Sequence, residues 1–221
     1  MTTPEEDPDR AAGIGEDASR DQLRALAHPL RLTLMERIGR LGTARAADLA
    51  AELGIPANSV SYHLRILARG GVVAEAPEAA RDKRDRVWKL AQSSFRSGPV
   101  DPSGADGTPA EAREYEAASS AVSLAALDWM RTTWAARAGA SDPDTTGKSS
   151  LVATTLRISS DQFDELADLV GTTIMEFNRL NRDEHGADVA GDPDSESPAT
   201  DFHVLFTLVG DRDAHSPSQD S

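Results

Sequence analysis

The stretch NSVSYHLRIL, Asn58 to Leu67, decides the fold of this chain. Val60, Leu64 and Leu67 recur at helical spacing, which predicts a helix that buries one face. A plain surface helix usually carries Glu and Lys on its other face, but here the intervening residues are hydrogen bonders: Ser59, Ser61, Tyr62, His63 and Arg65. No acidic residue occurs between Asn58 and Gly71, which fits a surface that must approach phosphate groups.

A second helix and a short bend precede this stretch. The segment ARAADLAAEL is expected to form a helix with Thr43 as its N-cap and to stop at Gly54. Pro56 lies near the first turn of the next helix, which ends at Gly70 and Gly71. Two helices joined by three or four residues that include a glycine predict a helix-turn-helix.

Two further helices are predicted upstream, one from Ser19 and one from Pro29. Proline suits a first helical turn, and apolar residues follow it at steps of four, four and three: Leu30, Leu34, Ile38 and Leu41. His28, directly before the proline, is expected to have a structural role at the join between these helices.

The residues after the helix-turn-helix predict a hairpin. VVAEAPE, residues 72–78, is expected to be a strand, AARDKRDR a polar tip, and VWKLA, residues 87–91, the returning strand. A hairpin in this position is a wing, so residues 19–96 are predicted to form a winged helix-turn-helix domain.

The remaining chain is divided by composition. Residues 1–18 and 211–221 are predicted to be disordered tails, and residues 97–109, rich in Gly, Pro and Asp, a linker. A C-terminal region, 110–210, is predicted to hold a long helix over 110–138, a strand over 151–158, a helix over 160–181 and a strand over 202–209. The expected fold class is α+β: an N-terminal winged helix-turn-helix, a long helix and a small strand–helix–strand unit.

The net charge of −14 over 221 residues is unevenly distributed. Residues 1–22 hold 7 acids and 2 bases (−5), residues 23–96 hold 7 acids and 13 bases (+6), and residues 97–221 hold 23 acids and 8 bases (−15). The overall charge argues against a nucleic-acid partner, but the basic block contains the opening stretch and favours one.

Other classes of protein find little support in the sequence. The chain has no cysteine, which excludes disulfides and thiolate metal sites, and no run of 18 apolar residues, so no membrane partner is expected. The first residues lack the pattern of a signal peptide, and a cytoplasmic protein is therefore expected. No catalytic or phosphate-binding motif is evident, so we expect no enzymatic activity and no cofactor.

The candidate DNA-binding residues follow from how a recognition helix enters the major groove. Asn58 can pair with adenine and Arg65 with guanine, whereas serine, tyrosine and histidine suit phosphates or water-bridged contacts. Arg45 is placed to contact the DNA backbone, and the wing cations could follow the neighbouring minor groove. The complete set is Arg45, Asn58, Ser59, Ser61, Tyr62, His63, Arg65, Arg69, Lys83, Arg84 and Arg86.

Two of these assignments have plainer alternatives. His63 could be an ordinary residue of the helix surface, and the wing cations, which alternate with Asp82 and Asp85, could be a solvated hairpin tip.

Three segments carry a resemblance to a known family: LRALAHPLRLTLMERI, TARAADLAAELGIPANSVSYHLRILARGGVV and RVWKLA. They resemble the ArsR/SmtB-type winged-helix repressors, over about residues 23–91, roughly a third of the chain. The positions that match the family pattern are Ser61, His63, Leu64, Leu67, Gly71 and Val73. The resemblance implies a dimeric transcription regulator, often a repressor that an effector releases.

The chain departs from the metal-sensing branch of that family. ARAADLA stands where that branch has a Cys-x-Cys site, and the helix over 110–138 contains no histidine. A branch without a metal site is therefore predicted, and any small-molecule effector is unidentified.

Large apolar residues on the helix over 110–138 could form a dimer or domain core, or alternatively line an effector pocket: Leu127, Trp129, Met130 and Trp134. The predicted partners are a second copy of the chain and double-stranded DNA with a near-palindromic operator. The alternative is a winged-helix protein-interaction module that recruits a basic partner through its acidic C-terminal half.

Overall fold

The computed structural model describes residues 18–80, 86–92, 95, 108–139, 149–180, 182, 187–189 and 201–210. Residues 97–107 of the predicted linker, residues 1–17 and 211–221 of the predicted tails, and Lys83 and Arg84 at the predicted wing tip lie outside these residues. Among the described residues, none of the helices combines the length and the hydrophobicity that a membrane span requires.

Helices α1 (Arg20–Leu26) and α2 (Pro29–Leu41) occupy the two predicted positions. Ser19 and Gln22 form a capping box at the start of α1, each satisfying a backbone N–H of the other. The Nδ1 atom of His28 accepts a hydrogen bond from the Leu30 backbone N–H at 3.1 Å and so caps α2. The expected structural role of His28 is thereby confirmed.

Helices α3 (Ala46–Leu53) and α4 (Ala57–Arg69) form the predicted helix-turn-helix. Gly54 adopts φ +66°, a left-handed conformation that ends α3 and suits glycine. The N-cap prediction for Thr43 is wrong, because Thr43–Arg45 forms strand β1 and Arg45 takes the N-cap position. The pairing of β1 with a later strand lies far away in sequence, and a local pattern does not show it.

The sheet is three-stranded and antiparallel, in the order β1-β3-β2. Strand β2 (Val73–Glu75) is shorter than the predicted 72–78, because a 3₁₀ turn, η1 (Pro77–Ala79), follows and proline cannot donate to a ladder. Strand β3 (Val87–Leu90) returns where predicted and pairs with both neighbours, Trp88 lying opposite Ala44 and Glu75.

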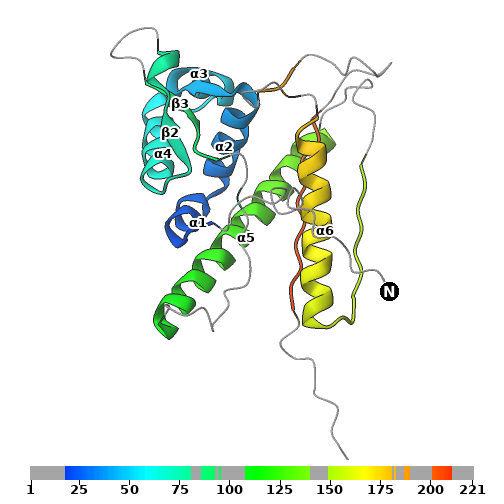
Figure 1. Ribbon diagram of the computed structural model, residues 1–221. Coiled ribbons are helices and arrows are strands. Elements are labelled where there is room, and N and C mark those ends of the chain that lie inside the picture. The colour runs from blue at the N-terminus through cyan, green and yellow to red at the C-terminus, as the bar shows by residue number, and fades with distance from the viewer. Residues whose placement is uncertain are drawn as a thin grey trace, which may run out of the picture.

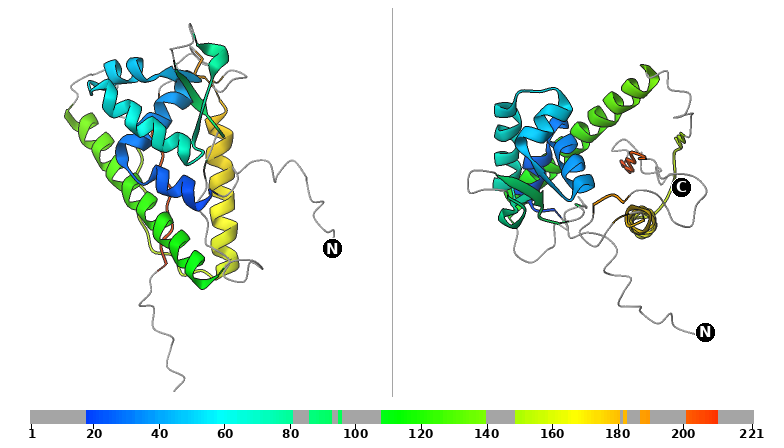
Figure 2. Two further views of the ribbon diagram at one scale, coloured as in Figure 1. Left: turned by 90° about the vertical axis from the view of Figure 1, so that its left-hand side faces the viewer. Right: turned by 90° about the horizontal axis from the view of Figure 1, so that it is seen from above.

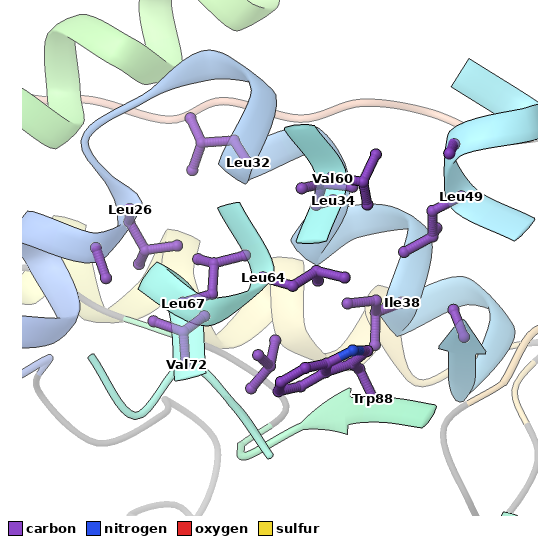
Figure 3. Packing of buried hydrophobic residues seen from close by; sticks show 14 of the residues in the cluster. Leu26, Leu32, Leu34, Ile38, Leu49, Val60, Leu64, Leu67, Val72 and Trp88 are labelled. Atoms are coloured by element: carbon purple, nitrogen blue, oxygen red, sulfur yellow. The ribbon is translucent and has the colours of Figure 1, made fainter. Parts of the chain in front are cut away.

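The core lies between α2, α3, α4 and the sheet (Figure 3). The stripe predicted from the opening stretch is confirmed, since Val60, Leu64 and Leu67 are completely buried. Their neighbours in the core include Leu34, Ile38, Leu49, Val72 and Trp88.

Helix α5 (Pro109–Gly139) confirms the predicted long helix and packs against α1 and α2 (Figure 1). Its buried positions are small, Ala118 and Ala125, which lets the helix lie close to its neighbours. Val122 and Trp129 add partly buried contacts to the same core. The first half of the C-terminal region is thus packed on α1 and α2, while the division into domains stays a prediction.

Helix α6 (Ser160–Asn178) begins with a capping box between Ser159 and Gln162 and matches its prediction to within a few residues. The two strands predicted beside it are wrong. Residues 151–158 and 202–209 are without regular secondary structure and pair with no described strand. An alternating apolar pattern favours an extended backbone, but a strand also needs a neighbour to hydrogen-bond.

The C-terminal part is tied to α2 through Arg40. Its guanidinium bonds Asp188 at 3.0 Å and Asp201 at 2.6 Å, and the Asp188 backbone N–H donates to the Arg40 carbonyl oxygen at 2.8 Å.

Candidate nucleic-acid interface

Helix α4 has two sharply different faces. Its apolar stripe points into the core (Figure 3), whereas Asn58, Arg65 and Arg69 are exposed and the Tyr62 side chain is 55% exposed. Ser59 and Ser61 are half-buried between these faces. The outer side of α4 is therefore rich in hydrogen-bond donors and has no carboxylate of its own.

The two arginines of α4 lie along the helix. The Nε–H of Arg65 donates to the Ser61 carbonyl oxygen at 3.0 Å, and that of Arg69 donates to the Arg65 carbonyl oxygen at 3.4 Å. Within the described part of the chain neither arginine forms a salt bridge. This arrangement fixes the stem of each side chain and directs the end of the guanidinium, which suits bidentate contacts, away from the core.

His63 does not lie on this exposed face. Its ring is half-buried, with its centroid 4.8 Å from that of His28 and 5.4 Å from that of Tyr62. Burial lowers the pKa of His63 below its ordinary value, and the nearby His28 and Arg31 lower it further. His63 is thus placed at the junction between α4 and the start of α2, where its contact with His28 supports the position of α4.

Arg31 belongs to the same junction and was missed in the sequence. Its Nη2 donates to the Arg24 carbonyl oxygen at 3.3 Å, and burial lowers its pKa, an effect that Tyr62 opposes. Burial likewise lowers the pKa of His28, with Arg31 adding to the effect. The signal in the sequence that could have identified Arg31 was a basic residue two positions after Pro29, in the first turn of the predicted helix.

Two of the other predicted cations, Arg45 and Arg86, lie in the described part of the chain, and both are paired with carboxylates. Arg45 forms a bidentate salt bridge with Asp48. Its Nε donates to Asp48 Oδ2 at 2.7 Å and its Nη2 to Asp48 Oδ1 at 2.9 Å, so the charge of Arg45 is largely neutralised by its neighbour. Arg86 lies 3.7 Å from Glu75. Arg65 and Arg69 on the exposed face of α4 therefore carry charges that the described carboxylates do not neutralise, whereas the charges of Arg45 and Arg86 are paired.

The four large apolar residues of α5 do not converge on one site. Trp129 is half-buried against the core and meets His203 edge to face, with ring centroids 5.1 Å apart. Met130 is half-buried, while Leu127 and Trp134 are 48% and 50% exposed. A pocket of about 190 Å³ lies elsewhere and is mostly charged, lined by Arg37, Arg40, Leu41, Glu52 and Asp188.

Comparison with known proteins agrees with this geometry. Residues 26–76 match the family model described as a helix-turn-helix domain, which spans α2, β1, α3, α4 and β2. A search of the curated proteins finds no match to this chain. The N-terminal part is therefore a helix-turn-helix domain, the kind of domain that binds DNA in transcription regulation.

Proposed function

We propose that this protein is a sequence-specific transcription regulator that reads the DNA major groove with α4, as a winged helix-turn-helix of the ArsR/SmtB type. The observation that carries the proposal is the outer face of α4. It presents Asn58, Tyr62, Arg65 and Arg69 without a carboxylate, on a helix locked to the core by three fully buried residues.

The residues of α4 have different expected roles. Asn58 lies in the first turn and Arg65 two turns later, so we propose that they reach base edges, asparagine on adenine and arginine on guanine. Tyr62 and Arg69 suit phosphate contacts, which fix the register of the protein on the duplex but carry no sequence information. His63 acts indirectly, by holding α4 against α2.

The charge distribution would orient the protein on DNA. Residues 23–96 carry a net +6 and residues 97–221 a net −15, counted from 13 bases and 7 acids, and from 8 bases and 23 acids. The basic part would be drawn to the polyanion while the acidic part is repelled. A duplex would therefore meet the helix-turn-helix first.

We further propose that the regulator is a homodimer and a repressor, without enzymatic activity. Two-fold symmetry then requires a near-palindromic operator with half-sites about one helical turn apart. A small molecule that binds the C-terminal part would be the signal for release.

Selection of duplexes from a genome-derived pool, followed by a salt titration, tests this function. Each phosphate neutralised releases counterions, so log K must fall steeply and linearly with log salt. If no duplex is retained even at low salt, the DNA-binding proposal fails. The rival function, recruitment of a basic partner protein by the acidic half, would then be favoured.

A further inference from the structure

Two extended segments accompany α6: residues 151–158, which lead into it, and residues 201–209 (Figures 1 and 2). The sheet β1-β3-β2 includes neither segment, and within the described ranges no backbone–backbone hydrogen bond is made by either. With respect to the described residues, each segment therefore has N–H and C=O groups available for pairing on both of its edges.

The segments run in the same direction. In Figure 1 the chain descends through 151–158, ascends through α6 and descends again through 201–209. This is the path of a strand–helix–strand crossover, in which the two strands would be parallel. Parallel strands that do not pair with each other can accept an antiparallel strand between them.

The surface around these segments is apolar and poorly covered. Leu151, Val152 and Val209 are 84%, 84% and 87% exposed. The apolar stripe of α6 is half-buried at best, and no residue of that helix is fully buried: the stripe consists of Phe163, Leu166, Val170 and Ile174. Apolar side chains exposed in this number mark an interaction site.

The charges suit a second copy of the chain as the occupant. Residues 151–158 contain one charged residue, Arg157, and residues 201–209 contain one of opposite sign, Asp201. In an antiparallel pairing the end of one segment lies beside the start of the other, so Arg157 would lie near Asp201, which also bonds Arg40 of its own chain at 2.6 Å. The apolar segments can therefore approach another copy without the repulsion that the −14 chain meets elsewhere.

We propose that two copies complete a shared four-stranded antiparallel sheet from these segments. The order is 151–158, then 201–209 of the partner, then 201–209, then 151–158 of the partner. A two-fold axis reverses strand direction, so each inserted strand runs antiparallel to the two strands that it separates. The sheet covers the apolar stripes of both α6 helices.

This interface has the size of a stable dimer. The two segments and the inner face of α6 supply about 20–30 residues per copy, as in interfaces that bury ~800 Å² per partner. The inference deepens the proposed homodimer and rests on it, by naming the surface through which the copies associate.

Light scattering after gel filtration, without DNA, gives the first test on the full chain. A mass of twice 23.5 kDa is expected at micromolar concentration. A Val204→Pro/Phe206→Pro variant should be monomeric, because proline cannot donate to a ladder, while a Val204→Thr/Phe206→Tyr control should stay dimeric. A monomeric wild type, or a proline variant that remains dimeric, would overturn the proposal.

Cysteine cross-linking tests the strand order, and the cysteine-free chain makes each introduced thiol unique. The two copies of 201–209 are central neighbours, so one of Val204→Cys, Leu205→Cys or Phe206→Cys should give a covalent dimer on oxidation. Leu156→Cys, on an outer strand, and Ala51→Cys, exposed on α3, should not. Dimers from Ala51→Cys alone would refute the interface.

A double variant separates pairing between copies from pairing within one chain. Leu156→Cys with Val204→Cys should give a covalent dimer, and a monomer with an internal disulfide would contradict the shared sheet. Because no DNA is present, these results stand or fall separately from the DNA-binding proposal.

Discussion

The rings of His28 and His63 lie 4.8 Å apart at an interplanar angle of 51°, and they join the first residue before α2 to the middle of α4. His28 also caps α2 through its Nδ1 atom. The His28 side chain thus caps α2 and also contacts α4, the helix that we propose reads DNA.

The two functions of His28 can be separated by substitution. Asparagine is a good N-cap but lacks the ring, whereas alanine lacks both. His28→Ala should therefore lower the free energy of unfolding by about 1 kcal/mol more than His28→Asn, the usual value of a helix cap. Urea denaturation measures this difference, and equal stability of the two variants would contradict the capping role.

Acidification should destabilise the folded protein through this pair. Burial lowers the pKa of both histidines in the folded state, so the unfolded chain, with values near 6.5, takes up protons first. The stability that the neutral rings contribute is complete above pH 6.5 and is lost as the pH falls through that value toward the folded pKa of each ring. Unfolding at pH 7.5 and 5.5 measures the loss.

The control must account for Glu36, whose shift has the opposite sign. Burial raises its pKa, so protonation of Glu36 favours the folded state as the pH falls. A His28→Asn/His63→Gln variant keeps Glu36 and should show a smaller loss between pH 7.5 and 5.5. Among the charged or titratable groups around the pair, Arg31 on α2 lowers the pKa of both rings and His28 lowers that of His63, with the ring of Tyr62 beside His63. An unchanged pH profile would exclude the pair as the cause.

Leu64 should be a major contributor to stability. It is completely buried within the core cluster, so Leu64→Ala removes apolar contacts and leaves a cavity, at a cost of about 2–5 kcal/mol. Leu127→Ala removes the same atoms from a side chain that is 48% exposed and should cost far less. Thermal unfolding of both variants checks this, and similar losses would contradict the assignment of the α4 stripe to the core.

Arg40 should hold the C-terminal segments on α2. Its bonds to Asp188 and Asp201 are lost in Arg40→Ala, and Arg40→Lys keeps the charge without the forked geometry. We expect faster amide hydrogen exchange at 187–189 and 201–209 in the alanine variant, less in the lysine variant, and none of this change in α3 or α4. Unchanged exchange in the C-terminal segments would exclude this anchoring role.

Local patterns were sufficient for most of the helices. The spacing of Val60, Leu64 and Leu67 predicted α4, and proline and glycine placed its ends, because these signals act over one or two turns. Strand β1 escaped prediction because three residues of TAR become a strand through pairing with Val87–Lys89, more than 40 residues later. The segment 151–158 shows the converse: its apolar pattern predicted a strand, but pairing is a property of two segments.

The candidate site was predicted in part. Residues on the outer face of α4 follow from helical geometry, so Asn58, Tyr62 and Arg65 are exposed where the pattern placed them. The position of His63 depends on the packing of α2 across α4, and the pairing of Arg45 depends on Asp48 three residues later on α3. Neither follows from the periodicity of α4 alone.

The most direct test of the central claim is the binding of Arg65→Ala to a duplex selected by the wild-type protein. Fluorescence anisotropy at fixed salt should show a loss of about 1–3 kcal/mol and relaxed specificity at one base pair, as for a lost contact to guanine. Arg113→Ala removes the same charge from an exposed position on α5 and should bind like the wild type. Equal affinity and specificity of the Arg65→Ala and Arg113→Ala variants would contradict the claim that α4 reads the major groove.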